Sequence, residues 1–184
     1  MKTSRSGASG GNVRVGTPDD LLIILDKLLE RRDGAWWDTL FSERARTLPF
    51  VVGWPDESLV DDFAREILRA GRVLELGCGN GRNAIYLASR DCSVDAVDFS
   101  SVAIRWANDL ARAAQQKVRF IHGSIFDLDR EPAAYDIVYD SGCFHHVPPH
   151  RREGYVDLVS TVLKPGGILS MICFNPAGGS GLTD

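Results

Sequence analysis

The feature that most constrains this chain is a glycine-rich stretch, VLELGCGNGRNA, over residues 73–84. Gly77, Gly79 and Gly81 alternate there, directly after a short apolar run. Glycine tolerates left-handed backbone conformations and lets a ligand come close to the main chain. The amide groups of the helix expected next favour an anionic group. The spacing therefore predicts a tight strand-to-helix turn that contacts a ligand.

Short apolar runs alternate with helix-length segments from residue 72 onward. The runs are RVLEL, SVDAVD, VRFIH, YDIVYD and ILSMICF, and the longer segments include SVAIRWANDLARAAQQ and RREGYVDLVSTVL. Strands that are apolar on both faces and alternate with helices indicate a parallel sheet with helices on each side. We therefore expect an α/β fold with a Rossmann-like, doubly wound and mostly parallel sheet.

Two amphipathic helices are expected before this region. The segments are TPDDLLIILDKLLERRDG and PDESLVDDFAREILRAG, and each ends at a glycine that suits a helix C-terminus. The stretch between them, WWDTLFSERARTLPFVVGWP, is aromatic and is expected to be irregular. The expected organisation is a flexible tail over residues 1–16, N-terminal helices with a cofactor-covering segment over 17–71, and a sheet-bearing core over 72–184 that forms one domain with them.

The composition argues against two classes of partner. The formal net charge is -4, without the concentration of Lys and Arg that nucleic-acid binding needs. No run approaches the roughly 20 apolar residues of a membrane span. The four cysteines form no CxxC pair, which suits a reducing compartment: Cys78, Cys92, Cys143 and Cys173. We expect a cytoplasmic protein that binds neither nucleic acid nor membrane.

The glycine spacing distinguishes between two ligand classes. A dinucleotide fingerprint, G-x-G-x-x-G, needs a glycine where this sequence has Arg82; the chain instead reads G-x-G-x-G, preceded by Glu75. Asp98 closes the second strand, where an acidic side chain would hold a pair of ribose hydroxyls in either class. A ribose-bearing ligand other than a dinucleotide is favoured. A nicotinamide-dependent oxidoreductase and a binding module without catalysis stay as alternatives.

Several motifs in the right order resemble the class I S-adenosylmethionine-dependent methyltransferases. LELGCGNG, AVDFSSVAI, VRFIHGSIFDL and YDIVYDSGCFHHV are similar to the first four motifs of that superfamily, and LKPGGILSMICF is similar to the turn and strand that follow. The resemblance implies that the protein binds S-adenosylmethionine as its cofactor. It also implies methyl transfer to a small-molecule acceptor.

The same resemblance implies ten cofactor-binding positions: Trp54, Glu75, Gly77, Cys78, Gly79, Asp98, Phe99, Ser124, Ile125 and Asp140. Glu75 and the glycines would surround the methionine end, and Glu75 with Asp140 would supply negative charge for its cations. Asp98 would hold the ribose hydroxyls. Ser124 and Ile125 would flank the adenine, and Ser124 stands where many relatives have an aspartate.

The tryptophans divide into two groups. Trp54 lies in a stretch that resembles the cofactor-covering segment of the family. Trp36 and Trp37 are instead expected to pack the first helices on the sheet, as buried aromatic residues commonly do.

The region DSGCFHHVPPHRREGYVDLV narrows the resemblance to the thiopurine, halide/thiol and tellurite-resistance methyltransferases. Ser141 stands where thiopurine enzymes carry an arginine beside the substrate thiol, which argues against an anionic, thiopurine-like acceptor. Small thiols, metalloid oxyanions and natural-product hydroxyls or amines stay open. An alcohol or phenol needs a base, and His145 is the candidate catalytic residue. Loop packing is the alternative for it and for His146.

No metal site is expected, although four sulfur and imidazole side chains lie close in sequence: Cys143, His145, His146 and His150. Pro148 and Pro149 break any helical presentation of these side chains, and no second ligand group is present.

The fifth predicted strand is expected to form an edge of the sheet. The class I fold adds two strands beside the fifth, and this sequence ends soon after it. We expect the chain to lack those two strands, which would leave Ile168 to Phe174 exposed. An unpaired edge with apolar side chains favours self-association.

Overall fold

The computed structural model describes residues 17–28, 33–42 and 52–173. The chain divides into two compact units, residues 1–31 and 32–184. The first unit contains helix α1 (Pro18–Leu28), none of whose residues is buried. Its start is capped reciprocally: the Asp20 amide donates to the Thr17 hydroxyl over 3.2 Å, and the Thr17 amide donates to the Asp20 carboxylate over 2.9 Å.

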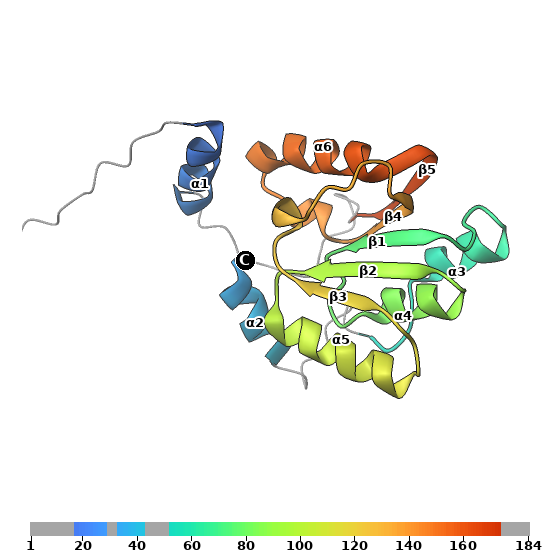
Figure 1. Cartoon of the computed structure of the whole chain (residues 1–184). Coiled ribbons are helices and arrows are strands. Elements are labelled where there is room, and N and C mark those ends of the chain that lie inside the picture. Colours follow the sequence, from blue (N-terminus) through green and yellow to red (C-terminus); the bar gives the residue numbers. More distant parts are fainter. Residues whose placement is uncertain (1–16, 29–32, 43–51, 174–184) are drawn as a thin grey trace, which may run out of the picture. The chain divides into compact units, whose positions relative to one another are not determined.

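The second unit is built on one parallel sheet of five strands in the order β3-β2-β1-β4-β5 (Figure 1). The strands are β1 (Arg72–Leu76), β2 (Ser93–Asp98), β3 (Arg119–His122), β4 (Tyr135–Ser141) and β5 (Leu163–Ile172). The strand order reverses between β1 and β4, so the carboxyl ends of these two strands border the expected ligand site. The predicted α/β fold with a mostly parallel sheet is confirmed.

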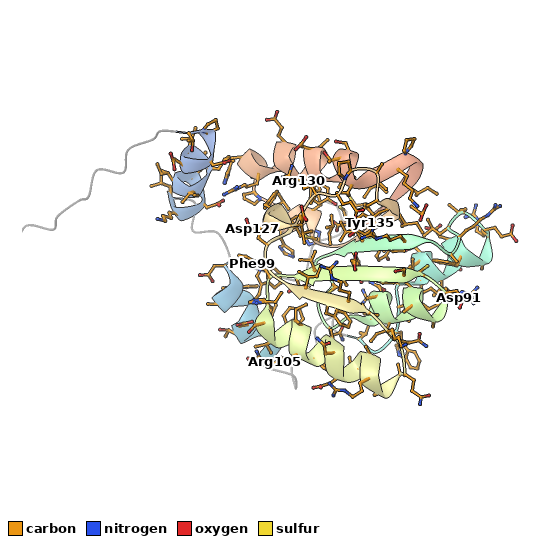
Figure 2. All side chains as sticks on the ribbon, in the orientation of Figure 1. Asp91, Phe99, Arg105, Asp127, Arg130 and Tyr135 are labelled. Carbon is orange, nitrogen blue, oxygen red and sulfur yellow. The ribbon has the colours of Figure 1, made fainter. Side chains whose placement is uncertain are left out.

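Helices cover both faces of the sheet. They are α2 (Gly34–Ser42), α3 (Glu57–Ala64), α4 (Arg82–Ser89), α5 (Ser101–Ala113) and α6 (Arg152–Val162), and single 3-10 turns are η1 (Ile125–Asp127), η2 (Phe144–His146) and η3 (Pro149–Arg151). Figure 1 shows α6 on one face of the sheet and α3, α4 and α5 on the other. In Figure 2, Phe99 lies at the carboxyl end of the sheet, and Asp91 lies at the opposite end.

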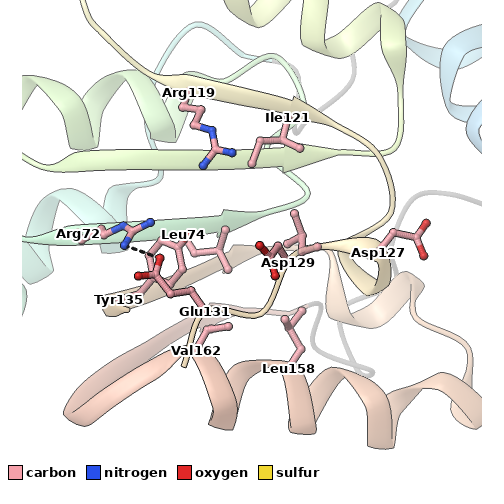
Figure 3. A pocket seen from close by; sticks show the side chains of 11 residues that line it. Arg72, Leu74, Arg119, Ile121, Asp127, Asp129, Glu131, Tyr135, Leu158 and Val162 are labelled. Atoms are coloured by element: carbon pink, nitrogen blue, oxygen red, sulfur yellow. Dashed lines mark hydrogen bonds and ion pairs between the residues drawn. The ribbon is translucent and has the colours of Figure 1, made fainter. Parts of the chain in front are cut away.

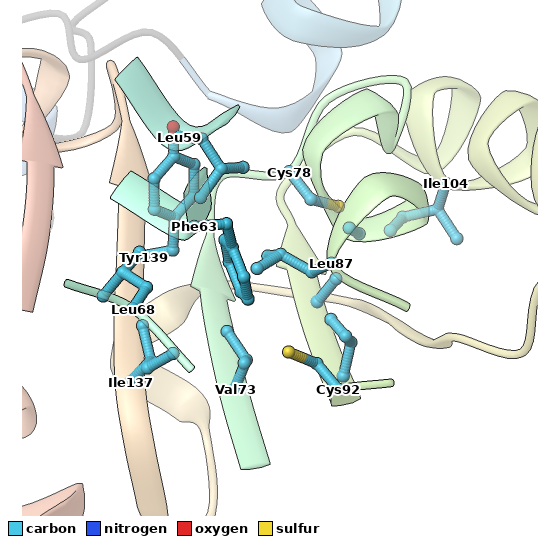
Figure 4. Close-up of a cluster of buried hydrophobic side chains, with 13 residues drawn as sticks. Leu59, Phe63, Leu68, Val73, Cys78, Leu87, Cys92, Ile104, Ile137 and Tyr139 are labelled. Carbon is cyan, nitrogen blue, oxygen red and sulfur yellow. The ribbon is translucent and has the colours of Figure 1, made fainter. Parts of the chain in front are cut away.

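Two hydrophobic clusters occupy the two faces. One joins Leu59 and Phe63 of α3 and Leu87 of α4 to Val73 of β1 (Figure 4). The other joins residues of α6, such as Leu158, to the intervening residues of the strands. Because successive side chains of a strand point to opposite faces, β1 contributes to both clusters.

The boundaries differ from expectation at three places. The expected irregular stretch contains α2, which begins after Asp33, whose carboxylate accepts the Trp36 amide over 2.9 Å. The helix expected over residues 55–71 ends at Ala64, because Glu66 adopts a left-handed conformation with φ of 57°. Strand β5 begins before Ile168 and ends at residue 172, and Phe174 lies outside the described residues.

Strand β5 forms one edge of the sheet. It pairs with β4, and within residues 52–173 no strand pairs with its other side. Ile168 and Leu169 are partly exposed there. No helix in the described part of the chain is long and apolar enough to cross a membrane.

Candidate cofactor and acceptor site

The glycine-rich stretch forms the predicted turn between β1 and α4. Gly77 and Gly81 have φ values of 71° and 79°, in the left-handed region. A Cβ atom on Gly77 would lie 2.8 Å from the Cβ of Cys143, and one on Gly81 would lie 2.9 Å from that of Ala107. Both glycines are therefore required by backbone conformation and by close packing.

Asp98 lies at the carboxyl end of β2 and is tied to the turn. Its carboxylate is buried and accepts the Gly79 amide over 2.7 Å at one oxygen and the Ser100 amide over 2.8 Å at the other. Burial raises the pKa of Asp98, and the bonds from Ser100 and Gly79 oppose that shift. Each carboxylate oxygen has two lone pairs, so both keep one for a ligand hydroxyl.

Glu75 lies on β1 between Ala96 of β2 and Tyr139 of β4. It is only 1% exposed, and its Oε2 atom has no hydrogen-bond partner among the described residues. Burial raises the pKa of Glu75 to about 8, and the positive charge of Arg82 opposes that shift. A buried polar atom without a partner costs free energy, which a positively charged or donor group of a ligand would recover.

A buried polar network anchors the segment before α3 to the start of α4. Asn83 donates to the Asp56 carboxylate over 2.9 Å, and Tyr139 donates to it over 2.8 Å. Burial works to raise the pKa of Asp56, but a hydrogen bond from Ser141 and the charge of Arg82 outweigh it and lower the pKa. Sequence reasoning missed this network, although Asn83 lies within the glycine motif.

Trp54 belongs to the anchored segment, but its indole lies at the surface. Its carbonyl oxygen accepts a hydrogen bond from Arg82 over 2.9 Å, while the residue is 78% exposed. The main chain of Trp54 therefore lies beside α4. The contact of its indole with a cofactor stays a prediction.

The adenine-flanking positions lie beyond β3. The Ser124 hydroxyl accepts the Phe126 amide over 3.2 Å and caps η1, while Ile125 is buried. The Gly123 amide donates to the Asp98 carbonyl oxygen over 3.0 Å, so this loop is joined to the end of β2. Of the ten predicted positions, nine thus lie near the carboxyl ends of the strands, while the cofactor contact of the tenth, Trp54, stays a prediction.

Asp140 is the penultimate residue of β4 and is fully buried. Its carboxylate accepts the Cys143 amide over 2.7 Å, the Phe144 amide over 3.1 Å and the Tyr155 hydroxyl over 2.6 Å. Burial raises the pKa of Asp140, and these hydrogen bonds, led by that of Tyr155, oppose the shift. Hydrogen bonds from within the chain therefore reach both carboxylate oxygens, and these bonds fix the shape of the loop after β4.

That loop brings two imidazoles together. The Nε2 atoms of His145 and His146 lie 3.0 Å apart, a hydrogen-bond distance at which one nitrogen donates and the other accepts. Burial lowers the pKa of His145, so its neutral form is favoured. The ring of His146 also packs edge-on against that of Trp37, with ring centroids 4.9 Å apart.

Helix α2 lies against the site through residues that the sequence did not single out. Asp38 accepts hydrogen bonds from the Ser100 hydroxyl over 2.6 Å, the Ser101 hydroxyl over 3.0 Å and the Val102 amide over 3.1 Å. The ring of Phe41 lies 3.4 Å from the position that a Cβ on Gly79 would occupy. The contacts of Asp38 join positions about sixty residues apart, so no local pattern could reveal them.

A pocket lies on the face of the sheet that α6 covers (Figure 3). Its lining includes Arg72, Arg119 and Tyr135, the first residues of β1, β3 and β4, and it is closed by Leu158 and Val162 of α6. Arg72 pairs with Glu131 over 3.0 Å, so these two charges of the lining neutralise each other. Within the described residues, no group of three or more His, Cys, Asp or Glu side chains could hold a metal ion.

The residues at the glycine turn fit S-adenosylmethionine. Asp98 keeps acceptor capacity for a pair of ribose hydroxyls, and the unpartnered Oε2 of Glu75 suits a cationic or donor group. The bare main chain of Gly77 allows close approach. Comparison with known proteins agrees with this geometry. Residues 73–167 match the family described as "Methyltransferase domain".

Two relatives and one solved structure illustrate the similarity. The chain is 34% identical over 143 residues to 27-O-demethylrifamycin SV methyltransferase of Amycolatopsis mediterranei, covering 68% of this chain and 52% of that protein. It is 27% identical over 174 residues to thiocyanate methyltransferase 1 of Arabidopsis thaliana, covering 91% and 71%. A solved structure concerned with conversion of a disulfide bond into a thioacetal group during echinomycin biosynthesis superposes with a TM-score of 0.61 at 28% identity, covering 66% and 49%. The chain thus spans about half the length of the rifamycin relative.

Proposed function

Since this chain belongs to the class I S-adenosylmethionine-dependent methyltransferases, we propose that it transfers a methyl group from that cofactor to a small-molecule acceptor. The observation that carries the proposal is the joint placement of Glu75, the glycine turn and Asp98 at the carboxyl ends of β1 and β2. When bound, the cofactor supplies an electrophilic methyl group on a sulfonium ion.

The chain's own residues would hold and orient the two reactants. Asp98 would accept two ribose hydroxyls, and Glu75 would offer a buried carboxylate to the positively charged end of the cofactor. Gly77 would permit that end to approach the main chain. Methyl transfer is an in-line displacement, so much of the rate acceleration comes from alignment of the acceptor atom in a site that excludes water.

His145 would serve as the base for a hydroxyl acceptor. Burial lowers its pKa and so favours the neutral imidazole, the form that a general base needs. Its Nε2 atom lies 3.0 Å from that of His146, which provides a second nitrogen for the proton. A thiol loses its proton readily and would need this group less.

A hydroxyl acceptor has the most support among the acceptor classes. The loop after β4 offers a pair of imidazoles, and one relative acts on 27-O-demethylrifamycin SV. The relative named for thiocyanate, an anion with a nucleophilic sulfur, supports the alternative of a sulfur acceptor such as a thiol. Transfer of label from [methyl-³H]-S-adenosylmethionine to phenols, thiols, selenite and tellurite tests the proposal. Cofactor binding without transfer to any acceptor would favour a binding module, and thermal protection by NAD instead of S-adenosylmethionine would favour an oxidoreductase.

We also propose a cytoplasmic location and self-association of the chain along β5. The four cysteines form no CxxC pair, which suits a reducing compartment. The outer edge of β5 offers backbone groups to a second copy, beside the partly exposed Ile168 and Leu169. Hydrogen exchange of β5 amides at two protein concentrations tests the association. Protection that is independent of concentration would count against it.

A further inference from the structure

We propose that Tyr155 is a positioning residue for the acceptor side of the site: through Asp140 it holds the loop that carries Cys143, His145 and His146. The inference rests on the proposed methyl transfer and extends it to a residue outside the site itself. Tyr155 lies on α6 and touches neither the glycine turn nor Asp98 in any contact described above.

Tyr155 and Asp140 form a buried pair. Tyr155 is 1% exposed and Asp140 is fully buried, and the tyrosine hydroxyl donates to Oδ2 of the carboxylate over 2.6 Å. The other oxygen, Oδ1, accepts the Cys143 amide over 2.7 Å. The tyrosine hydroxyl therefore orients the carboxylate, and the carboxylate in turn accepts hydrogen bonds from main-chain amides of the loop. Charge-assisted hydrogen bonds of this kind are among the stronger ones in proteins.

The loop depends on this carboxylate for its shape. Gly142 has φ of 89°, in the left-handed region, and η2 is a single turn with no side-chain cap of its own. The Cys143 and Phe144 amides at the start of η2 are satisfied by Asp140. The Phe144 ring also packs on the Tyr155 ring, with centroids 4.8 Å apart. Tyr155 thus supports the loop with its hydroxyl and with its ring.

Displacement of the loop would move the candidate base, His145, relative to the glycine turn. Cys143 packs so closely on Gly77 that no side chain could replace that glycine. The His145 ring lies 3.0 Å from the position of a Cβ on Gly142 and contacts His146, which in turn packs against Trp37. The loop therefore sets the distance between the imidazole pair and the glycine turn.

Strand β4, which carries Asp140 near its carboxyl end, provides a matched control at its amino end. Tyr135, the first residue of β4, is also buried and donates its hydroxyl to a carboxylate, that of Asp95, over 2.7 Å. This pair lies near the amino ends of β2 and β4, away from the loop after β4. Tyr135→Phe and Tyr155→Phe thus delete the same atom from the same kind of buried bond, and only the second bond supports the loop.

The test compares these two variants with wild type. Tyr155→Phe keeps the ring contact with Phe144 and removes the hydroxyl. We expect kcat with a hydroxyl acceptor to fall about tenfold or more, because small displacements of reacting groups are costly. The Kd of S-adenosylmethionine, measured by calorimetry, should stay within about twofold, since the glycine turn is intact. Tyr135→Phe should lower the unfolding temperature comparably and leave kcat unchanged.

Nuclear magnetic resonance provides a readout that does not require turnover. In Tyr155→Phe the imidazole ¹⁵N resonances of His145 and His146 should shift, and those of His122 should not; Tyr135→Phe should shift none of them. Asp140→Asn is a second variant. It replaces one of the two carboxylate oxygens by an NH₂ donor and should shift the same histidine resonances. Equal effects of the two tyrosine variants on kcat and on the spectra would overturn the inference. If wild type transfers no methyl group but the spectra change as expected, the proposed function fails and the positioning role stands.

Discussion

The main-chain amide of Gly79 donates a hydrogen bond to the carboxylate of Asp98 over 2.7 Å. This bond joins the turn after β1 to the end of β2, and the Ser100 amide holds the other carboxylate oxygen. The side chain expected to bind the ribose is therefore also the side chain that fixes the glycine turn. A change at Asp98 should act on both.

Asp98→Asn should weaken S-adenosylmethionine binding. The amide keeps one acceptor oxygen for the ribose and replaces the other by an NH₂ group, so one ribose hydroxyl loses its acceptor, at a cost of about 1–3 kcal/mol, or roughly 5- to 150-fold in Kd. Titration calorimetry measures the change. Asp95→Asn is the control on the same strand, because Asp95 pairs with Tyr135 and Arg72 at the amino end. It should destabilise the fold and leave Kd unchanged; unchanged affinity in Asp98→Asn would remove Asp98 from the site.

Glu75→Gln should change how stability depends on pH. The pKa of Glu75 is about 8 in the folded protein, against an ordinary value of 4.5. Between these values the unfolded chain has released a proton that the folded chain retains, so wild type loses up to about 1.4 kcal/mol of stability per pH unit as pH rises.

Glutamine does not ionise, so the Glu75→Gln variant does not lose this stability as the pH rises. Thermal unfolding without cofactor should therefore show Glu75→Gln to be more stable than wild type at about pH 8, with the difference shrinking as the pH falls toward about 4. The same variant should bind S-adenosylmethionine more weakly, because a neutral amide offers no charge to a cation. Unfolding curves that stay parallel across this range would show that the pKa of Glu75 is not raised.

His145→Ala should lower turnover with a hydroxyl acceptor far more than with a thiol. A general base typically contributes about 10²- to 10⁴-fold where the nucleophile must lose a proton. Initial rates with matched phenol and thiophenol acceptors measure the difference. His150→Ala is the control from the same loop region and should affect both acceptors equally and weakly. Equal losses in His145→Ala would reduce His145 to a packing role.

Asp38→Asn should destabilise the fold at neutral pH more than at low pH. Burial works to raise the pKa of Asp38, but hydrogen bonds from Ser100, Val102 and Ser101 outweigh it and lower the pKa below 3.8. The ionised group therefore stabilises the protein above pH 3.8, and the effect is lost as pH falls through the folded-state value.

The measurement is thermal unfolding of Asp38→Asn and wild type at about pH 7 and about pH 3, with an expected difference of about 1 kcal/mol at the higher pH, as for loss of a helix cap. Asp109→Asn is the control on α5, because its pair with Arg112 is exposed and contributes little. A difference between wild type and Asp38→Asn that is as large at low pH as at neutral pH would contradict the argument.

The sequence by itself determined the elements whose signals are local. The predicted runs RVLEL and SVDAVD coincide with β1 and β2, since each is a short stretch rich in apolar and β-branched residues. The left-handed glycine turn also followed from sequence, because only glycine adopts that conformation without strain. The position of Asp98 followed from its place at the end of a strand.

Only the tertiary structure decided which side chains become partners. Helix α2 escaped prediction because Asp38 contacts residues about sixty positions away. In the same way, the bond between Tyr155 and Asp140 and the unpartnered Oε2 of Glu75 depend on what surrounds each group after folding. Backbone propensity and hydrophobic period are written in neighbouring residues, whereas burial and hydrogen-bond partners arise from long-range packing, which no local pattern encodes.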